Sequence, residues 1–188
     1  MKKIAFLAIA ASAAIASPAM AQSQNVTGTI TLTGNVAKKC YVGSDNAATT
    51  FSASHDFLEL AKADGTLRTI ADSEMDADAT MDFTIKCNTG NPTVTISRTP
   101  MTTAAAAAAG YTNSISYNGI VDVDPASGLA VSFDTDAATG PLATGQLGGP
   151  LKATGPNVHV TAHNFTATGI LVAGGYSGQI SIIIAPTV

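Results

Sequence analysis

Apolar and polar residues alternate along most of the chain, which is the pattern of β-strands that bury one face. The first run has threonine at positions 27, 29, 31 and 33, and its even positions hold Val26, Gly28, Ile30, Leu32, Gly34 and Val36. Residues 81–87 repeat the pattern on odd positions and end at Cys87. Shorter runs follow at Val94 and Ile96, Ile115 and Tyr117, Val121 and Val123, Leu129, Val131 and Phe133, and Val158 and Val160. The last run comprises Tyr176, Gly178, Ile180, Ile182 and Ile184.

Turn-forming residues separate these runs. They lie at 88–92, Asn118–Gly119, Asp124–Pro125 and in the Gly/Pro-rich stretch 140–156. About ten short strands with frequent turns indicate an all-β, antiparallel sandwich rather than an α/β fold. The six alanines 104–109 are the one clear helical window, and they predict a short helical insertion between strands.

The first 21 residues predict an export signal. Lys2 and Lys3 form a positive start, residues 4–17 are apolar and rich in alanine, and Ala19 and Ala21 are the small residues that a signal peptidase reads. Cleavage is expected before Gln22, which delivers the mature chain outside the cytoplasm. Because no later segment reaches about 18 consecutive apolar residues, the sequence predicts no transmembrane anchor.

Charged residues make up only 12% of the chain. This low fraction argues against a disordered tail or a nucleic-acid-binding protein, because both classes need many more ionised side chains. The formal net charge of −4 includes Lys2 and Lys3, so removing these two positive charges with the leader gives −6 for the mature chain. A mildly acidic chain has no electrostatic attraction to phosphate or anionic lipid. We therefore expect neither nucleic acid nor direct membrane insertion.

Two cysteines, Cys40 and Cys87, are present. In an exported chain they most simply form one disulfide, because the compartment is oxidising. The alternative is a pair of free buried thiols. A metal site would need more ligands than two cysteines provide.

The other candidates for chemistry are weak. On a helix, His159 and His163 would share one face and could bind zinc together. The surrounding alternation instead predicts a strand, where residues four apart are separated by roughly 13 Å, too far to share a metal ion. His55 and Asp56 have no nucleophile motif around them and are interpreted as a surface turn. Five acidic residues lie close together in the sequence: Asp72, Glu74, Asp76, Asp78 and Asp82. They are interpreted as a solvated face, because the stretch lacks the glycine and terminal glutamate of a calcium-binding loop. The sequence thus predicts no catalytic, cofactor-binding or metal-ligating residue.

The informative feature is the N-terminal extension, residues 22–36. It predicts an alternating strand at the start of the mature chain, where chains usually fray. A strand of this kind must pair with a sheet, which is either the sheet of its own chain or the open edge of another copy. The chain therefore divides into a leader, 1–21, the extension, 22–36, and a β domain, 37–188.

Three segments resemble chaperone-usher pilins, a family that includes spore-coat-protein-U-like and alpha-type branches. The extension from Gly28 to Val36, followed by Ala37-Lys38-Lys39 and Cys40, is similar to the N-terminal extension and first strand of these pilins. Residues 83–87 resemble the strand with the second cysteine, and residues 174–182 resemble the glycine, tyrosine and alternating final strand.

The resemblance implies an incomplete immunoglobulin-like β-sandwich that lacks one strand. The missing strand would be donated by the extension of another subunit, with Val26, Gly28, Ile30, Leu32, Gly34 and Val36 facing the groove. The implied partners are other copies or related pilin subunits, a periplasmic chaperone and an outer-membrane usher. The implied location is the periplasm in transit and then a fimbria on the cell surface.

A second interpretation remains open. The protein would be a self-contained secreted β-sandwich, acting in binding or as a surface coat, with the extension folded into its own sheet. A secreted hydrolase has no arrangement of residues behind it.

Overall fold

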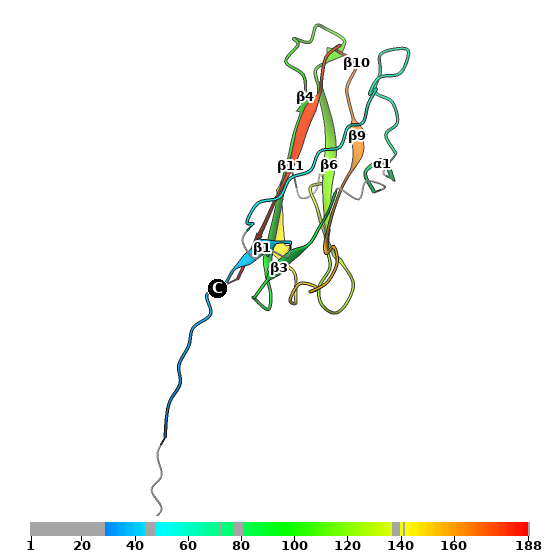
Figure 1. Cartoon of the computed structure of the whole chain (residues 1–188). Helices are drawn as coiled ribbons and strands as arrows, with labels where there is room; N and C mark the ends of the chain where they lie inside the picture. The colour runs from blue at the N-terminus through cyan, green and yellow to red at the C-terminus, as the bar shows by residue number, and fades with distance from the viewer. Residues whose placement is uncertain are drawn as a thin grey trace, which may run out of the picture. The chain divides into compact units, whose positions relative to one another are not determined.

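The computed structural model describes residues 29–43, 48–71, 73–76, 81–136, 140 and 142–187. The chain separates into two units, residues 1–35 and 36–188, which are described separately. The regular secondary structure of the second unit is almost entirely strand, so the all-β prediction is confirmed (Figure 1). Its elements are β1 (Cys40–Val42), α1 (Ser73–Asp76), β2 (Asp82–Phe83), β3 (Ile85–Cys87), β4 (Thr93–Thr102), β5 (Tyr111–Thr112), β6 (Ser114–Val123), β7 (Val131–Asp134), β8 (Leu142–Gln146), β9 (Val158–Thr166), β10 (Ile170–Leu171) and β11 (Ser177–Ala185).

The long strands β4 and β6 organise the sheet. β4 pairs antiparallel with β11 along nearly its whole length and with β8 over Thr93–Ser97. β6 pairs antiparallel with β9 and β7, and β9 continues to β2. The two groups, β11-β4-β8 and β7-β6-β9-β2, join where Met101 and Thr102 pair with Ile115 and Ser114. The short β5 and β10 form a separate parallel pair.

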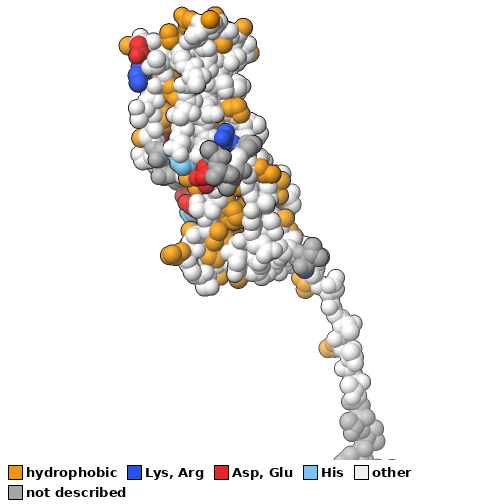
Figure 2. Space-filling view, turned by 180° about the vertical axis from the view of Figure 1, so that it is seen from behind, with side chains coloured by type: hydrophobic (Ala, Val, Ile, Leu, Met, Phe, Trp, Pro, Cys, Tyr) orange, Lys and Arg blue, Asp and Glu red, His pale blue; other side chains and the backbone are white. Residues whose placement is uncertain are grey.

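Few charged side chains appear on the face shown in Figure 2, where apolar atoms are spread among neutral polar ones. This agrees with the low charge of the sequence. Within the part of the chain that the structure describes, no helix is long and apolar enough to cross a membrane.

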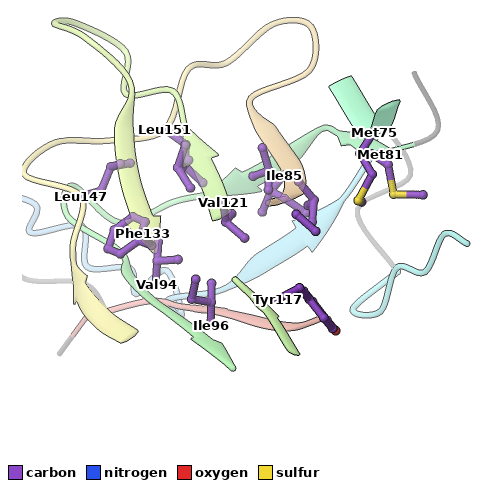
Figure 3. Close-up of a cluster of buried hydrophobic side chains, with 14 residues drawn as sticks. Met75, Met81, Ile85, Val94, Ile96, Tyr117, Val121, Phe133, Leu147 and Leu151 are labelled. Atoms are coloured by element: carbon purple, nitrogen blue, oxygen red, sulfur yellow. The ribbon is translucent and has the colours of Figure 1, made fainter. Parts of the chain in front are cut away.

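One apolar core takes side chains from both strand groups. Val94 and Ile96 on β4, Val121 and Val123 on β6, and Val158 on β9 have no exposed surface. In Figure 3, Met75, Met81 and Tyr117 lie toward one end of this cluster, and Phe133 and Leu147 lie toward the other. The alternation therefore predicts the buried faces of these strands correctly. The exception is Leu129, which lies before β7 begins and is 90% exposed.

Asn157 completes the sheet where β2 and β3 are interrupted. It is fully buried, and its side-chain oxygen accepts a hydrogen bond from the Ile85 amide at 2.8 Å. Its side-chain nitrogen donates to the carbonyls of Ile85 and Lys152, both at 2.7 Å. The backbone amide of Asn157 donates to the carbonyl of Phe83 at 2.9 Å. One side chain thus supplies the partners that a neighbouring strand would otherwise provide.

The prediction of a turn at Asn118–Gly119 is wrong, because both residues lie inside β6. The pairing of β6 with β9 shifts register between Ser116 and Asn118. A Cβ atom built at Gly119 would lie 3.1 Å from the side chain of Ile180 on β11. The glycine therefore marks a strand irregularity and a close approach between the two strand groups rather than a turn.

Two further local predictions also need correction. The alanines 104–109 form no helix, because six residues give too few bonds to offset nucleation; instead, the loop closes with the Tyr111 amide donating to the carbonyl of Ala108. The predicted loop 140–156 contains β8, which forms because Leu142 to Gln146 pair with β4.

The disulfide between Cys40 and Cys87 is present, with the sulfur atoms 2.01 Å apart. It joins β1 to β3, where the two cysteines are directly paired in an antiparallel ladder. The prediction of one disulfide is confirmed, and the alternative of free thiols is excluded.

Candidate functional site

A groove of about 650 Å³ runs along β11 within the second unit. One side is formed by consecutive residues 176–182, and the other by residues 51–57, which we call the wall segment. The floor between them is mostly apolar and takes residues from α1, β2, β4, β6 and β9: Met75, Met81, Phe83, Met101, Tyr117, Val160, Ala162 and Phe165. The groove therefore exposes part of the core between two extended stretches of backbone.

β11 is an edge strand. Among the described residues it pairs with β4 and with no second strand. Its side chains alternate, with Ile180, Ile182 and Ile184 half-buried against the core and Ile183 60% exposed. An edge strand presents a row of backbone N–H and C=O groups that another extended chain can pair with. The groove thus combines a strand edge with apolar pockets.

The predicted residues of the last strand lie where the alternation places them. Ile180, Ile182 and Ile184 belong to β11, and Tyr176 immediately precedes it. The hydroxyl of Tyr176 donates toward the carbonyls of Thr112 and Val172, both at 3.0 Å, which anchors the start of the strand. At Gly178, a Cβ atom would lie 3.0 Å from the Thr99 carbonyl oxygen. Glycine is therefore needed there for β11 to approach β4.

The floor of the groove is adaptable. Three methionines line it, and flexible thioether side chains can fill pockets of different shape. The ring of Tyr117 stacks on Phe165, with the centroids 5.4 Å apart, and Arg98 lies 5.9 Å from the Tyr117 centroid. Burial raises the pKa of the Tyr117 hydroxyl, so this group stays neutral. The floor therefore offers an apolar, uncharged surface.

The wall segment is held by aromatic packing. Phe51 contacts Phe83 of β2, with ring centroids 4.4 Å apart, and Phe57 contacts Phe165 of β9 at 5.0 Å. No residue from 51 to 57 belongs to a strand. In Figure 1 this cyan segment passes in front of β6 and β9, in agreement with the ring contacts. The wall therefore lies over the core without a strand ladder of its own.

Arg68 joins the wall segment to α1. Its guanidinium forms a two-point ion pair with Glu74, at 2.7 and 2.8 Å. The hydrogen bond from Arg68, together with one from the Ala71 amide, holds the pKa of the Glu74 carboxyl at about 2, below its ordinary value of 4.5. A carboxyl with a lowered pKa stabilises the fold above its ordinary pKa, and this contribution is lost as the pH falls through about 2.

We expect the side-chain carboxyl of Glu74 to titrate near pH 2 in the folded protein. In the variant Arg68→Leu, the midpoint should rise toward 4.5, because the main hydrogen-bond donor is gone. Carbon-detected NMR titration measures both midpoints. A midpoint near 4.5 in the unaltered protein would show that the ion pair does not form.

The N-terminal extension is described only in part. Val26 and Gly28 lie outside the described residues, as does the leader 1–21. Ile30, Leu32 and Val36 are 87%, 90% and 79% exposed, and no described residue before Cys40 belongs to a strand. A Cβ atom at Gly34 would meet no other atom within 4 Å. The described part of the extension thus carries an exposed apolar face.

The weaker candidates for chemistry remain separate. On β9, Nδ1 of His159 lies 2.8 Å from Asp82, whereas Nε2 of His163 lies 3.4 Å from Asp134. His55 packs edge-on against Phe57 in the wall segment. Within the described ranges, no group of three or more His, Cys, Asp or Glu side chains is placed to hold a metal ion.

The described residues of the acidic stretch 72–82 do not gather into one site. Glu74 pairs with Arg68, and Asp82 pairs with His159. Asp72, Asp78 and the side chain of Asp76 lie outside the described residues. Glu74 and Asp82 therefore contact side chains on different parts of the chain.

Sequence reasoning missed two residues that shape this region. Arg68 was not singled out, because its partners at 57, 59 and 74 follow no local motif. Asn157 lies between the predicted loop 140–156 and the strand at Val158, and no local pattern signals that its side chain replaces a strand partner. The sparse charge of the chain gives the one available signal for Arg68, since a charged residue among apolar neighbours needs a partner.

Comparisons of the chain with known protein families, with characterised proteins and with solved structures give no match. Three features of the chain itself bear on its function. They are the groove along β11, the exposed apolar face of the extension, and the disulfide that follows it.

Proposed function

We propose that this protein is a structural subunit of an extracellular fimbria, assembled by donor-strand exchange through a chaperone-usher pathway. In this proposal the second unit is an immunoglobulin-like β-sandwich that lacks one strand. Residues 22–36 of one copy, or of a related subunit, occupy the groove along β11 of the next. The observation that carries the proposal is the groove, because it leaves a strand edge and apolar core exposed together.

The extension is long enough to follow the edge of β11. β11 has nine residues and spans about 30 Å at the usual strand rise. The apolar and glycine positions 26 to 36 cover eleven residues, or about 35 Å when extended. The extension can therefore follow the full edge and still leave residues to connect to Cys40.

The chemistry of donor and groove also agrees. The even face of the extension offers aliphatic side chains, and the floor offers methionine, phenylalanine and valine. Burying Val26, Ile30, Leu32 and Val36 stabilises the complex by at most about 6–12 kcal/mol, before backbone hydrogen bonds are counted. Glycine at position 34 would let the donor backbone pass close to the floor.

Repetition of this contact gives a filament. The donor and acceptor surfaces differ, so a pair of copies keeps one free donor and one free acceptor. Further copies can therefore add at both ends unless the rotation between successive copies closes a ring. A chaperone would cover the groove in the periplasm, because an exposed strand edge invites aggregation. An usher at the outer membrane would then direct the exchange.

Peptide capture tests the proposal. Monomeric mature chain, residues 22–188, is mixed with a synthetic peptide of residues 22–36. Because the chain has no tryptophan, a tryptophan added at the start of the peptide reports binding without background. We expect one peptide per chain with a dissociation constant of about 1 μM or lower, that is, about 8 kcal/mol or more.

The matched control is a peptide of the same composition in which Thr29 and Ile30, and Thr31 and Leu32, exchange places. This change moves the isoleucine and the leucine to the opposite face of the strand, away from Val26 and Val36. We expect it to bind at least about tenfold more weakly. Equal binding of the two peptides, or no saturable binding of either, would overturn the proposal.

A further inference from the structure

Arg68 uses every N–H group of its guanidinium. Besides the two-point ion pair with Glu74, its Nε donates to the carbonyl of Glu59 at 2.6 Å and its Nη2 donates to the carbonyl of Phe57 at 2.9 Å. Its Nη1 also donates to its neighbour Thr69 at 3.2 Å. A planar, rigid donor with partners on two separate segments fixes their distance and orientation.

These bonds connect the two structures that border one side of the groove. Phe57 ends the wall segment, whereas Glu74 belongs to α1, whose Met75 lies on the groove floor. Arg68 therefore acts between the wall and the floor. Its side chain is 27% exposed, so water competes only in part for these bonds.

Arg68 also holds a strained turn. Leu58 lies between the two carbonyls that Arg68 binds, and its φ of 57° is in the left-handed region, which is unusual for a bulky residue. Its amide is held by the carboxylate of Asp56 at 2.9 Å, and its side chain is 82% exposed. Such a conformation persists only when surrounding contacts enforce it.

An empty groove favours movement of the wall segment over the groove floor. Phe83, Met101 and Phe165 on the floor are only partly buried, and covering their remaining apolar surface is favourable. The wall segment belongs to no strand, so no ladder opposes its movement over the floor. The turn from Phe57 to Glu59 follows directly on the wall segment. Bonds from Arg68 to both ends of this turn would hold the wall segment in place and keep the groove accessible.

We infer that Arg68 is a positioning residue that keeps the wall segment beside the empty groove, so that the groove remains open to an incoming donor strand. The inference rests on the proposed function. Arg68 does not touch the donor in this account; it acts through the carbonyls of Phe57 and Glu59. Its loss lets the wall segment move over the floor, and the donor must then displace it before pairing with β11.

The variant Arg68→Lys tests this role. Lysine keeps the positive charge and one contact to Glu74, but it cannot donate to four separate oxygen atoms at once. In the mature chain, we expect the association rate of the peptide of residues 22–36 to fall at least about tenfold, with the thermal unfolding midpoint within about 3 °C of the unaltered protein. Hydrogen exchange of the amides from 51 to 59 should become faster, while exchange in β6 and β9 stays unchanged.

Two further variants serve as controls. Lys152→Ala removes an exposed ion pair with Asp124, outside the residues that line the groove, and should leave the association rate unchanged. Glu74→Gln keeps the Arg68 bonds to the carbonyls of Phe57 and Glu59, and should slow peptide association by no more than about threefold. This variant also keeps the inference testable if Arg68→Lys does not fold, because a tenfold loss in Glu74→Gln would assign the effect to the ion pair and overturn the role of the carbonyl bonds.

The outcomes separate the inference from the proposed function. If the unaltered chain does not capture the peptide, the proposed function fails and the inference falls with it. If the unaltered chain captures the peptide and Arg68→Lys captures it equally fast, the proposed function stands and the inference is wrong.

Discussion

Removing residues 22–33 from the mature chain is expected to abolish polymers while leaving the second unit folded. The deletion takes away Val26, Ile30 and Leu32, which are worth roughly 1.5–3 kcal/mol each when fully buried, or roughly 4–9 kcal/mol together. It also removes most of the backbone that would pair with β11. The measurement is the fraction of protein in detergent-resistant polymers after assembly with the chaperone and usher, compared with the circular dichroism of the monomer.

Point variants on the two faces of the extension give the matched control. Ile30→Asp places a charge on the face that we propose enters the groove and should reduce polymers at least about a hundredfold, since a buried unpaired charge is strongly unfavourable. Thr31→Asp places the same charge on the opposite face and should have little effect. A deleted chain that still polymerises would contradict the account, and one that fails to fold would favour a self-contained sandwich that includes the extension.

The largest effect on stability is expected for Asn157→Ala. The substitution leaves the amide and carbonyl of Ile85 without partners, and Ile85 is only 3% exposed. Each buried polar group left unpaired costs about 1–3 kcal/mol, and the cavity adds to this, so we expect a loss of about 3–5 kcal/mol. Chemical denaturation of the mature chain measures the change, and the thermal midpoint should fall by about 10 °C.

Asn91→Ala is the control for this variant. Asn91 also forms two side-chain hydrogen bonds, to Gln146 and to the amide of Gly148, but both lie at the exposed surface. Water can replace such bonds, so we expect a loss of about 1 kcal/mol or less. If Asn157→Ala cost no more than Asn91→Ala, the side chain of Asn157 would not serve as a strand partner.

The alternation predicts the strands well where both faces have distinct environments. Val94, Ile96, Val121 and Val123 are fully buried, as their parity indicates. The errors arise where a distant contact overrides the local signal. Gly119 reads as a turn residue, but it makes room for Ile180, which lies 61 residues later in the chain. The alanines 104–109 favour helix locally, yet they are too few to sustain one.

The site could be anticipated in part. The alternation in the last strand and in the extension predicts an edge and a donor, and the structure supplies the groove beside the edge strand β11. The wall segment could not be anticipated, because residues 52–54, Ser-Ala-Ser, are small and give no strand signal. Arg68 could not be assigned a role either, since its partners come together only after the loop from 57 to 74 has folded.

The most direct test of the central claim is to map where the extension binds. The peptide of residues 22–36, with labelled methyl groups on Ile30 and Leu32, is bound to the mature chain and examined by NMR. The account predicts contacts from these methyl groups to Met81, Tyr117 and Phe165, and slower hydrogen exchange of amides in Ser177–Ala185 than in the empty chain. Contacts to another strand edge, such as β8, with exchange in β11 unchanged, would contradict it.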